Sequence, residues 1–132
     1  MGTLKTTLKV ESTDLFPTPV SFTVVNNNAV NGNFNGFNTV ALTTAYSALN
    51  ATTIDGTGAY LYLQSPSTNS GNIAVGYTGQ TAGAGATALA TLVYLSPGDT
   101  AFLPVGIGAT AATVVATTQS GTATLYFFIG EK

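Results

Sequence analysis

The chain has no arginine, histidine, cysteine or tryptophan, and charged residues make up only 6% of its 132 positions. Without histidine and cysteine, the most common general bases, thiol nucleophiles and transition-metal ligands are missing. Three lysines and five acidic residues leave a formal net charge of −2, which gives little electrostatic solubility to a free monomer. We therefore expect much of the surface to be occupied by neighbouring molecules or covered with threonine, serine and asparagine.

The same shortages exclude several classes of partner and site. Nucleic-acid binding needs lysine or arginine against the phosphates, and the three lysines form no cluster. The sequence has no run of about 18 apolar residues, so we expect no transmembrane helix and no membrane partner. The opening residues Met1–Lys5 do not follow the basic-then-apolar order of a secretory signal. The absence of cysteine excludes disulfides and thiolate metal sites.

What the chain does have is a succession of short alternating segments separated by proline, glycine and asparagine. Along Thr3–Glu11 the leucines fall on one face and the lysines on the other, which is typical of a half-buried strand. A short helix within Leu42–Leu49 is an alternative to the end of one expected strand, because alanine and leucine favour helices. About eight or nine short strands predict one all-β domain over residues 1–132, an antiparallel β-sandwich or jelly roll. The further strands are expected at Val20–Val25, Thr39–Tyr46, Ala59–Gln64, Ile73–Tyr77, Leu89–Leu95, Thr100–Val105, Thr113–Thr118 and Thr122–Ile129.

The first 19 residues are expected to stand apart from the rest. Ser12–Pro19 breaks the first strand, because its two prolines cannot donate to a ladder of hydrogen bonds. Residues 1–19 are therefore predicted to form an extended N-terminal arm, or an edge strand that its two lysines protect. The edge from Leu4 to Val10 is also available to pair with a partner strand. Leu4 and Leu8 are accordingly candidate interface residues.

The C-terminal third, Leu89–Ile129, is predicted to form two consecutive β-hairpins. Pro97-Gly98 suits a type II turn, because proline presets φ at the first central position and glycine accepts a positive φ at the second. The second turn is expected at Gln119–Gly121. In the last strand Tyr126 and Phe128 share one face, and these aromatic residues predict that this face is covered by another part of the chain or by another subunit. The opposite face carries Ala123, Leu125, Phe127 and Ile129.

The most polar segment is Asn26–Asn38, in which two asparagines are followed by glycine. Asn-Gly favours tight turns, so the first interpretation is a long loop with two turns. The alternative is an exposed contact loop in which Phe34 and Phe37 are the apolar anchors, since adaptable asparagine with aromatic anchors suits recognition.

The sequence does not indicate an enzyme, a cofactor or a metal site. Most of the carboxylates lie in turns or beside the termini, where they normally act as solvated turn residues or caps, and no Asp-x-Asp spacing indicates calcium. The six tyrosines lie mainly on expected strands, so a role in the core or at a subunit interface is favoured over a sugar-stacking platform. The carboxylates are Glu11, Asp14, Asp55, Asp99 and Glu131.

Two segments of the C-terminal third resemble small β-rich virion proteins of tailed bacteriophages. One is Leu95–Pro104, in which leucine, proline and glycine precede a second leucine and proline. The other is the Ala116–Gly121 stretch with the aromatic strand Thr122–Phe128 that follows it. The openings Thr3–Leu8 and Asp14–Pro17 are similar in style. The resemblance implies a capsid decoration, or cement, protein or a small tail-associated protein, and it implies no catalytic residue.

These observations predict a structural protein on the exterior of a virion. It would bind the major capsid protein or another virion protein and stabilise the shell by binding only its assembled state. We expect it to form a closed homo-oligomer, with a trimer at a local three-fold axis favoured over a dimer. Its candidate interface residues are Leu4, Leu8, Phe34, Phe37, Tyr126 and Phe128. The alternatives are a carbohydrate- or receptor-binding module of a phage tail fibre and a self-assembling surface or fibre subunit.

Overall fold

The computed structural model describes residues 2–14, 18–30, 34–49, 58–78, 90–105 and 113–131, with the backbone alone at positions 20, 34–36, 78 and 90. These residues form ten β-strands in three antiparallel sheets, and no helix occurs among them. Accordingly, the described part of the chain offers no helical segment of the length and apolarity that a membrane crossing needs. The predicted all-β class is confirmed.

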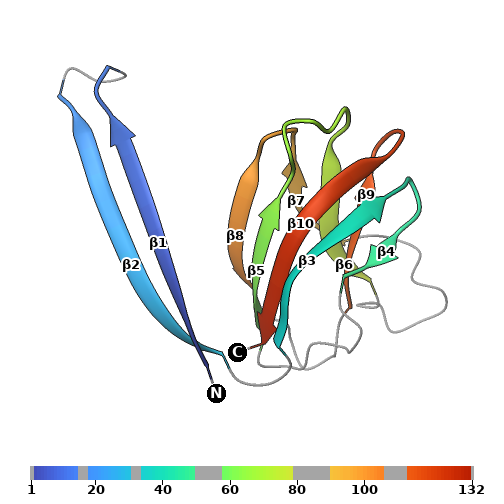
Figure 1. Ribbon diagram of the computed structural model, residues 1–132, viewed down its shortest axis with the longest axis horizontal. Coiled ribbons are helices and arrows are strands. Elements are labelled where there is room, and N and C mark those ends of the chain that lie inside the picture. Colours follow the sequence, from blue (N-terminus) through green and yellow to red (C-terminus); the bar gives the residue numbers. More distant parts are fainter. Residues whose placement is uncertain are drawn as a thin grey trace.

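Two four-stranded sheets lie face to face, and a two-stranded sheet stands beside them (Figure 1). The two-stranded sheet, here called the arm, consists of β1 (Gly2–Ser12) and β2 (Val20–Val30). In order across the first sheet are β3 (Phe34–Leu42), β10 (Ala123–Glu131), β5 (Ala59–Gln64) and β8 (Thr100–Val105). In order across the second sheet are β4 (Ser47–Ala48), β9 (Thr113–Thr118), β6 (Ile73–Thr78) and β7 (Ala90–Leu95).

The strand pairing of the sandwich is that of a jelly roll. From β3 onward the first strand pairs with the last, the second with the second last, and so on inward to β6 and β7. The strands β3 to β10 therefore form one long antiparallel ribbon, folded so that its successive pairs fall alternately in the first and the second sheet. Further pairing of β10 with β5 and of β6 with β9 joins the two strand pairs of each sheet. This arrangement confirms the predicted sandwich and its jelly-roll form.

The core lies between the two sheets and follows from the alternation of side chains along the strands. Leu61 and Leu63 of β5 are fully buried, whereas Tyr60 and Tyr62, which alternate with them, face outward. Burying one such leucine stabilises the fold by about 1.5–3 kcal/mol. The inward face of β10 was also predicted correctly, because its residues all belong to the core: Ala123, Leu125, Phe127 and Ile129.

The predicted β-hairpins of the C-terminal third are wrong, although their turns are correct. The amide of Asp99 donates to the carbonyl of Ser96 at 3.0 Å and Gly98 has a φ of +93°, as in a type II turn. However, β7 belongs to the second sheet and β8 to the first, and β9 and β10 are divided in the same way. These turns are corners that carry the chain from one sheet to the other. A turn sequence determines the local path, whereas pairing depends on strands that are distant in the sequence.

The expected Asn26–Asn38 loop is also wrong over the residues that the structure describes. Strand β2 continues to Val30 and β3 begins at Phe34, while residues 31–33 with their Asn-Gly pair lie outside the description. The asparagines enter a strand because the first residues of β1 supply a ladder for them, and the Asn28 amide lies 3.5 Å from the Thr6 hydroxyl. The arm therefore includes both strands on either side of the predicted break at Ser12–Pro19.

The connection after β3 departs from both of its predicted forms. The strand ends at Leu42, four residues before the expected end, and the alternative short helix is not formed. Ser47–Ala48 instead pairs with β9, and the amide of Leu49 donates to the carbonyl of Val114 at 2.8 Å. Burial of Leu49 on the core outweighs the helix propensity of its neighbours.

Candidate interaction surface

The arm has one apolar face that is largely exposed. Its register pairs Leu8 with Val24 and Val10 with Phe22, so these four side chains share a face with Leu4. Leu8 is 58% exposed and Phe22 is 47% exposed. An apolar surface of this kind on a strand pair of its own is a candidate site of interaction with another surface.

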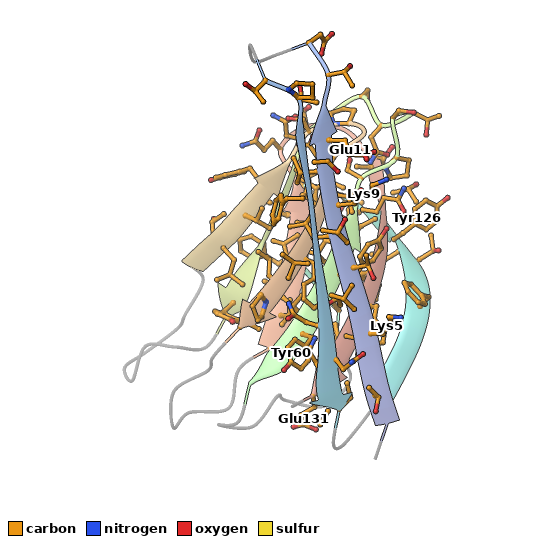
Figure 2. The ribbon with its side chains drawn as sticks, turned by 90° about the vertical axis from the view of Figure 1, so that its left-hand side faces the viewer. Lys5, Lys9, Glu11, Tyr60, Tyr126 and Glu131 are labelled. Carbon is orange, nitrogen blue, oxygen red and sulfur yellow. The ribbon has the colours of Figure 1, made fainter. Side chains whose placement is uncertain are left out.

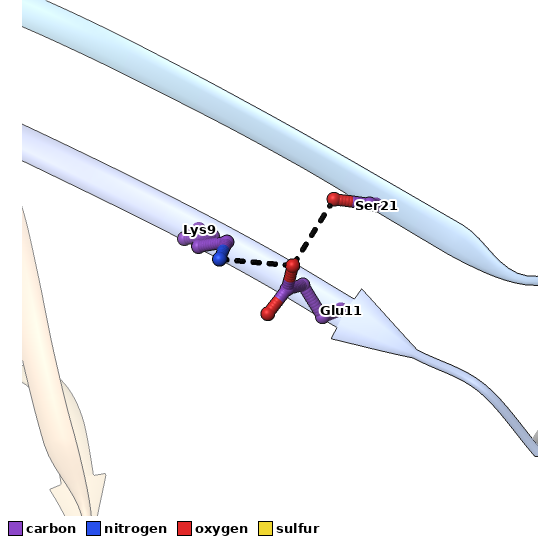
Figure 3. A network of polar contacts seen from close by, with 3 residues as sticks. All are labelled: Lys9, Glu11 and Ser21. Atoms are coloured by element: carbon purple, nitrogen blue, oxygen red, sulfur yellow. Dashed lines mark hydrogen bonds and ion pairs between the residues drawn. The ribbon is translucent and has the colours of Figure 1, made fainter.

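The opposite face of the arm carries its charge. The ammonium of Lys9 lies 2.9 Å from a carboxylate oxygen of Glu11, which also accepts a hydrogen bond from the Ser21 hydroxyl at 3.3 Å (Figure 3). Both charged side chains are more than half exposed, so this ion pair contributes about 0–1 kcal/mol. The apolar face is therefore the better candidate of the two for a contact with another surface.

The arm is attached to the first sheet at one end. Val30, the last residue of β2, is buried, and a methyl group built at Gly130 of β10 would lie 3.2 Å from a Val30 methyl carbon. The same methyl group would lie 3.0 Å from the ring of Phe128. Glycine at position 130 therefore lets Val30 and the Phe128 ring come together over the backbone of β10. From this point the arm diverges from the sandwich toward the turn between β1 and β2 (Figure 1).

The outer face of the first sheet carries a row of aromatic side chains, one from each strand. Phe128 is the direct cross-strand neighbour of Phe37 on one side and of Tyr62 on the other, and Tyr62 in turn is paired with Phe102. Tyr60 and Tyr126 lie on the same face, each two residues along its strand from Tyr62 and Phe128 respectively. We call these six residues the aromatic face.

The rings of the aromatic face contact one another. The Phe37 ring lies 5.4 Å from that of Phe128 and 5.8 Å from that of Tyr62, the latter edge to face. The rings of Tyr60 and Phe102 are stacked 6.0 Å apart. Phe128 is only 2% exposed, whereas Phe37 is 75% exposed. Most of these rings therefore pack against a neighbouring ring, and the exposed Phe37 ring lies against the buried Phe128 ring.

The arm lies in front of the aromatic face, as Figure 2 shows from the side of the arm. Between them is a groove of about 490 Å³. Threonine and lysine of β1 complete its lining, but its walls are mainly apolar. The residues that line it are Leu4, Lys5, Thr6, Thr7, Leu8, Phe37, Tyr62, Thr100, Phe102 and Phe128.

The structure brings together most of the residues expected at an interface. Leu4, Leu8, Phe37 and Phe128 line this one groove, although they come from three strands. Tyr126 lines an adjoining hollow of about 360 Å³ with Phe37. The structure does not describe the side chain of Phe34, but the backbone of Phe34 in β3 pairs with Gly130 of β10.

Sequence reasoning missed Tyr62 and Phe102, which complete the aromatic row. The signal was present in the alternation of Tyr60 and Tyr62 with buried leucines, which is the same pattern that singled out Tyr126 and Phe128. The row itself could not be predicted, because it depends on the cross-strand register of four strands.

Two of the described carboxylates make local contacts. Asp99 accepts a hydrogen bond from the Ser96 amide at 2.7 Å within its turn, and Glu11 pairs with Lys9. No group of three or more potential metal ligands occurs in the residues covered by the structure, and Asp55 lies outside them. Comparison with family models, with curated proteins and with solved structures finds no match to this chain.

Proposed function

We propose that this protein is a structural component of a virion, and that it acts as a capsid decoration protein. The observation that carries the proposal is the exposure of large apolar side chains on two separate surfaces of a charge-poor jelly roll. One surface is formed by the arm and the aromatic face. The other is the outer side of β7, where Tyr94 is 60% exposed and Leu92 is 39% exposed.

Two apolar surfaces suit a protein that bridges neighbours. A molecule that binds the assembled shell, and not its dissociated subunits, stabilises the shell by mass action. β7 lies at the edge of the second sheet, remote in the strand order from the aromatic face of the first. One surface can therefore bind another copy of the chain while the other binds the major capsid protein. Jelly rolls occur among viral capsid domains, although fold alone does not determine function.

The test compares particles of the encoding phage, assembled with and without the protein. We expect many bound copies on the capsid exterior and a higher temperature of shell disassembly when the protein is present. A double substitution of Leu92 and Tyr94 to serine should weaken capsid binding at least tenfold, whereas the matched control Tyr46→Ser, at a tyrosine 49% exposed outside the strands, should not. Particles that lack the protein, or carry it only at the tail, would contradict the decoration role.

A second candidate function is carbohydrate binding by a tail-fibre module. The hollow beside the groove combines rings of Phe37, Tyr62 and Tyr126 with the amide groups of Asn38 and Gln64, and jelly rolls also occur among lectins. If this function holds, a glycan array gives specific binding that Tyr126→Ala abolishes and Tyr94→Ala leaves intact. An array without specific binding would exclude it.

A further inference from the structure

We infer that the arm of one copy of this chain packs its apolar face against the aromatic face of a second copy. The inference concerns how copies of the chain associate, and it holds whatever the assembled copies bind. It identifies the occupant of the groove as protein of the same sequence, and it leaves the outer side of β7 free for a different partner.

The arm lies in front of the aromatic face of its own chain (Figure 2) but leaves part of that face exposed. It is fixed to the first sheet at Val30 and diverges from there (Figure 1). Leu8 lines the groove and yet remains 58% exposed, and Phe37 on the opposite wall remains 75% exposed. Each copy therefore carries two exposed apolar surfaces that can pack against each other, one on the arm and one on the first sheet.

The two surfaces match in chemistry. Both expose aliphatic and aromatic groups, and Lys5 is the one charged residue among those that line the groove. The Lys9–Glu11 ion pair lies on the arm face that would stay in solvent. Apart from Lys5, no charged residue of the described chain lines the groove, so the contact would be mainly apolar.

The exposed area agrees with a stable contact. Phe37, Phe102 and Tyr126 together expose about one and a half aromatic side chains, or about 300 Å² at about 200 Å² each. The exposed aliphatic and aromatic side chains of the arm add about 200 Å² of apolar area, as obtained from the free energies of transfer of such side chains and the free energy per unit of apolar area. At the usual apolar fraction, about 500 Å² of apolar area corresponds to an interface of about 900 Å².

Exchange of arms makes this contact more than once. Two copies that exchange arms form it twice and bury about 1,800 Å², which lies within the range of specific interfaces. In a ring of three, each copy donates one arm and accepts another. Eleven residues of β1 at about 3.3 Å each give an arm of about 36 Å, which is more than enough to cross four strands about 4.8 Å apart.

Contact through faces also agrees with the edge of the acceptor sheet. β8 forms that edge and contains Pro104, which has no amide hydrogen to offer to an added strand. Continuous strand addition at β8 is therefore interrupted, whereas the aromatic rings beside it remain accessible.

The test uses the absence of cysteine. Leu8→Cys and Phe37→Cys are made in separate chains, mixed and oxidised with copper phenanthroline, and disulfide-linked dimers are measured on a non-reducing gel. A link between the two variants can only join different copies. The matched control replaces Leu8→Cys with Val25→Cys, because Val25 is 49% exposed on the other face of the same arm.

We expect the Leu8→Cys and Phe37→Cys pair to link at least tenfold more than the Val25→Cys pair. We also expect the double variant Leu8→Thr/Val24→Thr, which makes this face of the arm polar but keeps it strand-forming, to dissociate the oligomer in light scattering. Equal linking of the two pairs, or a monomer at every concentration for the unmodified chain, would overturn the inference. Neither result would exclude binding of a capsid through β7.

Discussion

The side chain of Asn69 takes the place of a strand partner near the start of β10. Substitution of Asn69 tests how much its side-chain hydrogen bonds stabilise the first sheet. The Thr124 amide donates to its side-chain oxygen at 2.8 Å, and its side-chain nitrogen donates to the Thr124 carbonyl at 2.8 Å. The same nitrogen lies 3.0 Å from the Ser65 hydroxyl. Because β5 ends at Gln64, which pairs with Tyr126, Thr124 lies beyond the end of the regular ladder.

Asn69→Ala removes three hydrogen bonds and leaves both backbone groups of Thr124 without this partner. At about 1 kcal/mol for each bond, and with partial replacement by water at this half-buried position, we expect a loss of about 2–3 kcal/mol in the free energy of unfolding. The assay is urea denaturation followed by far-ultraviolet circular dichroism, since the chain has no tryptophan.

Asn69→Asp separates the two directions of hydrogen bonding. Ionised aspartate still accepts from the Thr124 amide, but it opposes the Thr124 carbonyl, so its folded-state pKa should be raised. The free energy of unfolding of the Asn69→Asp variant should then be greatest below about pH 4 and fall as the pH rises through the folded-state pKa.

The control for both variants is Asn72→Ala, because the Asn72 side chain is exposed and the backbone carbonyl makes its contacts in this region. We expect this variant to change stability by less than about 0.5 kcal/mol. A loss for Asn69→Ala no larger than that of Asn72→Ala would refute the assignment of Asn69 as a substitute strand partner.

Three further substitutions test other contacts. Gly130→Ala places a methyl group 3.0 Å from the Phe128 ring, so we expect about 1–3 kcal/mol of destabilisation, measured by thermal unfolding. Asp99→Ala removes the acceptor of the Ser96 amide and should cost about 1 kcal/mol in a urea titration. Burial raises the pKa of Tyr77, whose hydroxyl has no hydrogen-bond partner in the described part of the chain. Its contribution to stability should be complete below about pH 10 and fall above it. Tyr77→Phe should therefore be at least as stable as the unmodified chain and lose less stability between pH 10 and 11; an identical alkaline loss would contradict this.

The fold class could be predicted from the sequence because period-two alternation and turn residues act locally. The type II turn at Pro97-Gly98 and the inward leucines of β5 are examples, since each depends on a few neighbouring residues. The pairing of strands could not be predicted, because β7 and β8 have strong hairpin signals and yet lie in different sheets. In the structure each of these strands pairs with a strand that is distant in the sequence, β7 with β6 and β8 with β5.

The sequence indicates some residues of the candidate surface but not their arrangement. The sequence predicts that Phe37 is an anchor on a loop, whereas it lies on β3 and contacts Phe128. The sequence places Phe128 elsewhere, on one face of a predicted hairpin. Phe37 and Phe128 are both aromatic residues that the alternation along their strands places on the side away from the core. That they meet depends on the register between β3 and β10, and a shift of one residue would reverse the faces.

The measurement that tests the central claim most directly is the molar mass of the purified protein at several concentrations, by light scattering coupled to size exclusion. The claim is that the apolar arm and the aromatic face join copies of this chain into a closed assembly. It predicts a fixed mass of three copies, or of two, that does not grow with concentration and that Leu8→Thr/Val24→Thr reduces to one. A monomer at every concentration would contradict the claim, and open-ended growth would indicate a fibre subunit in place of a closed ring.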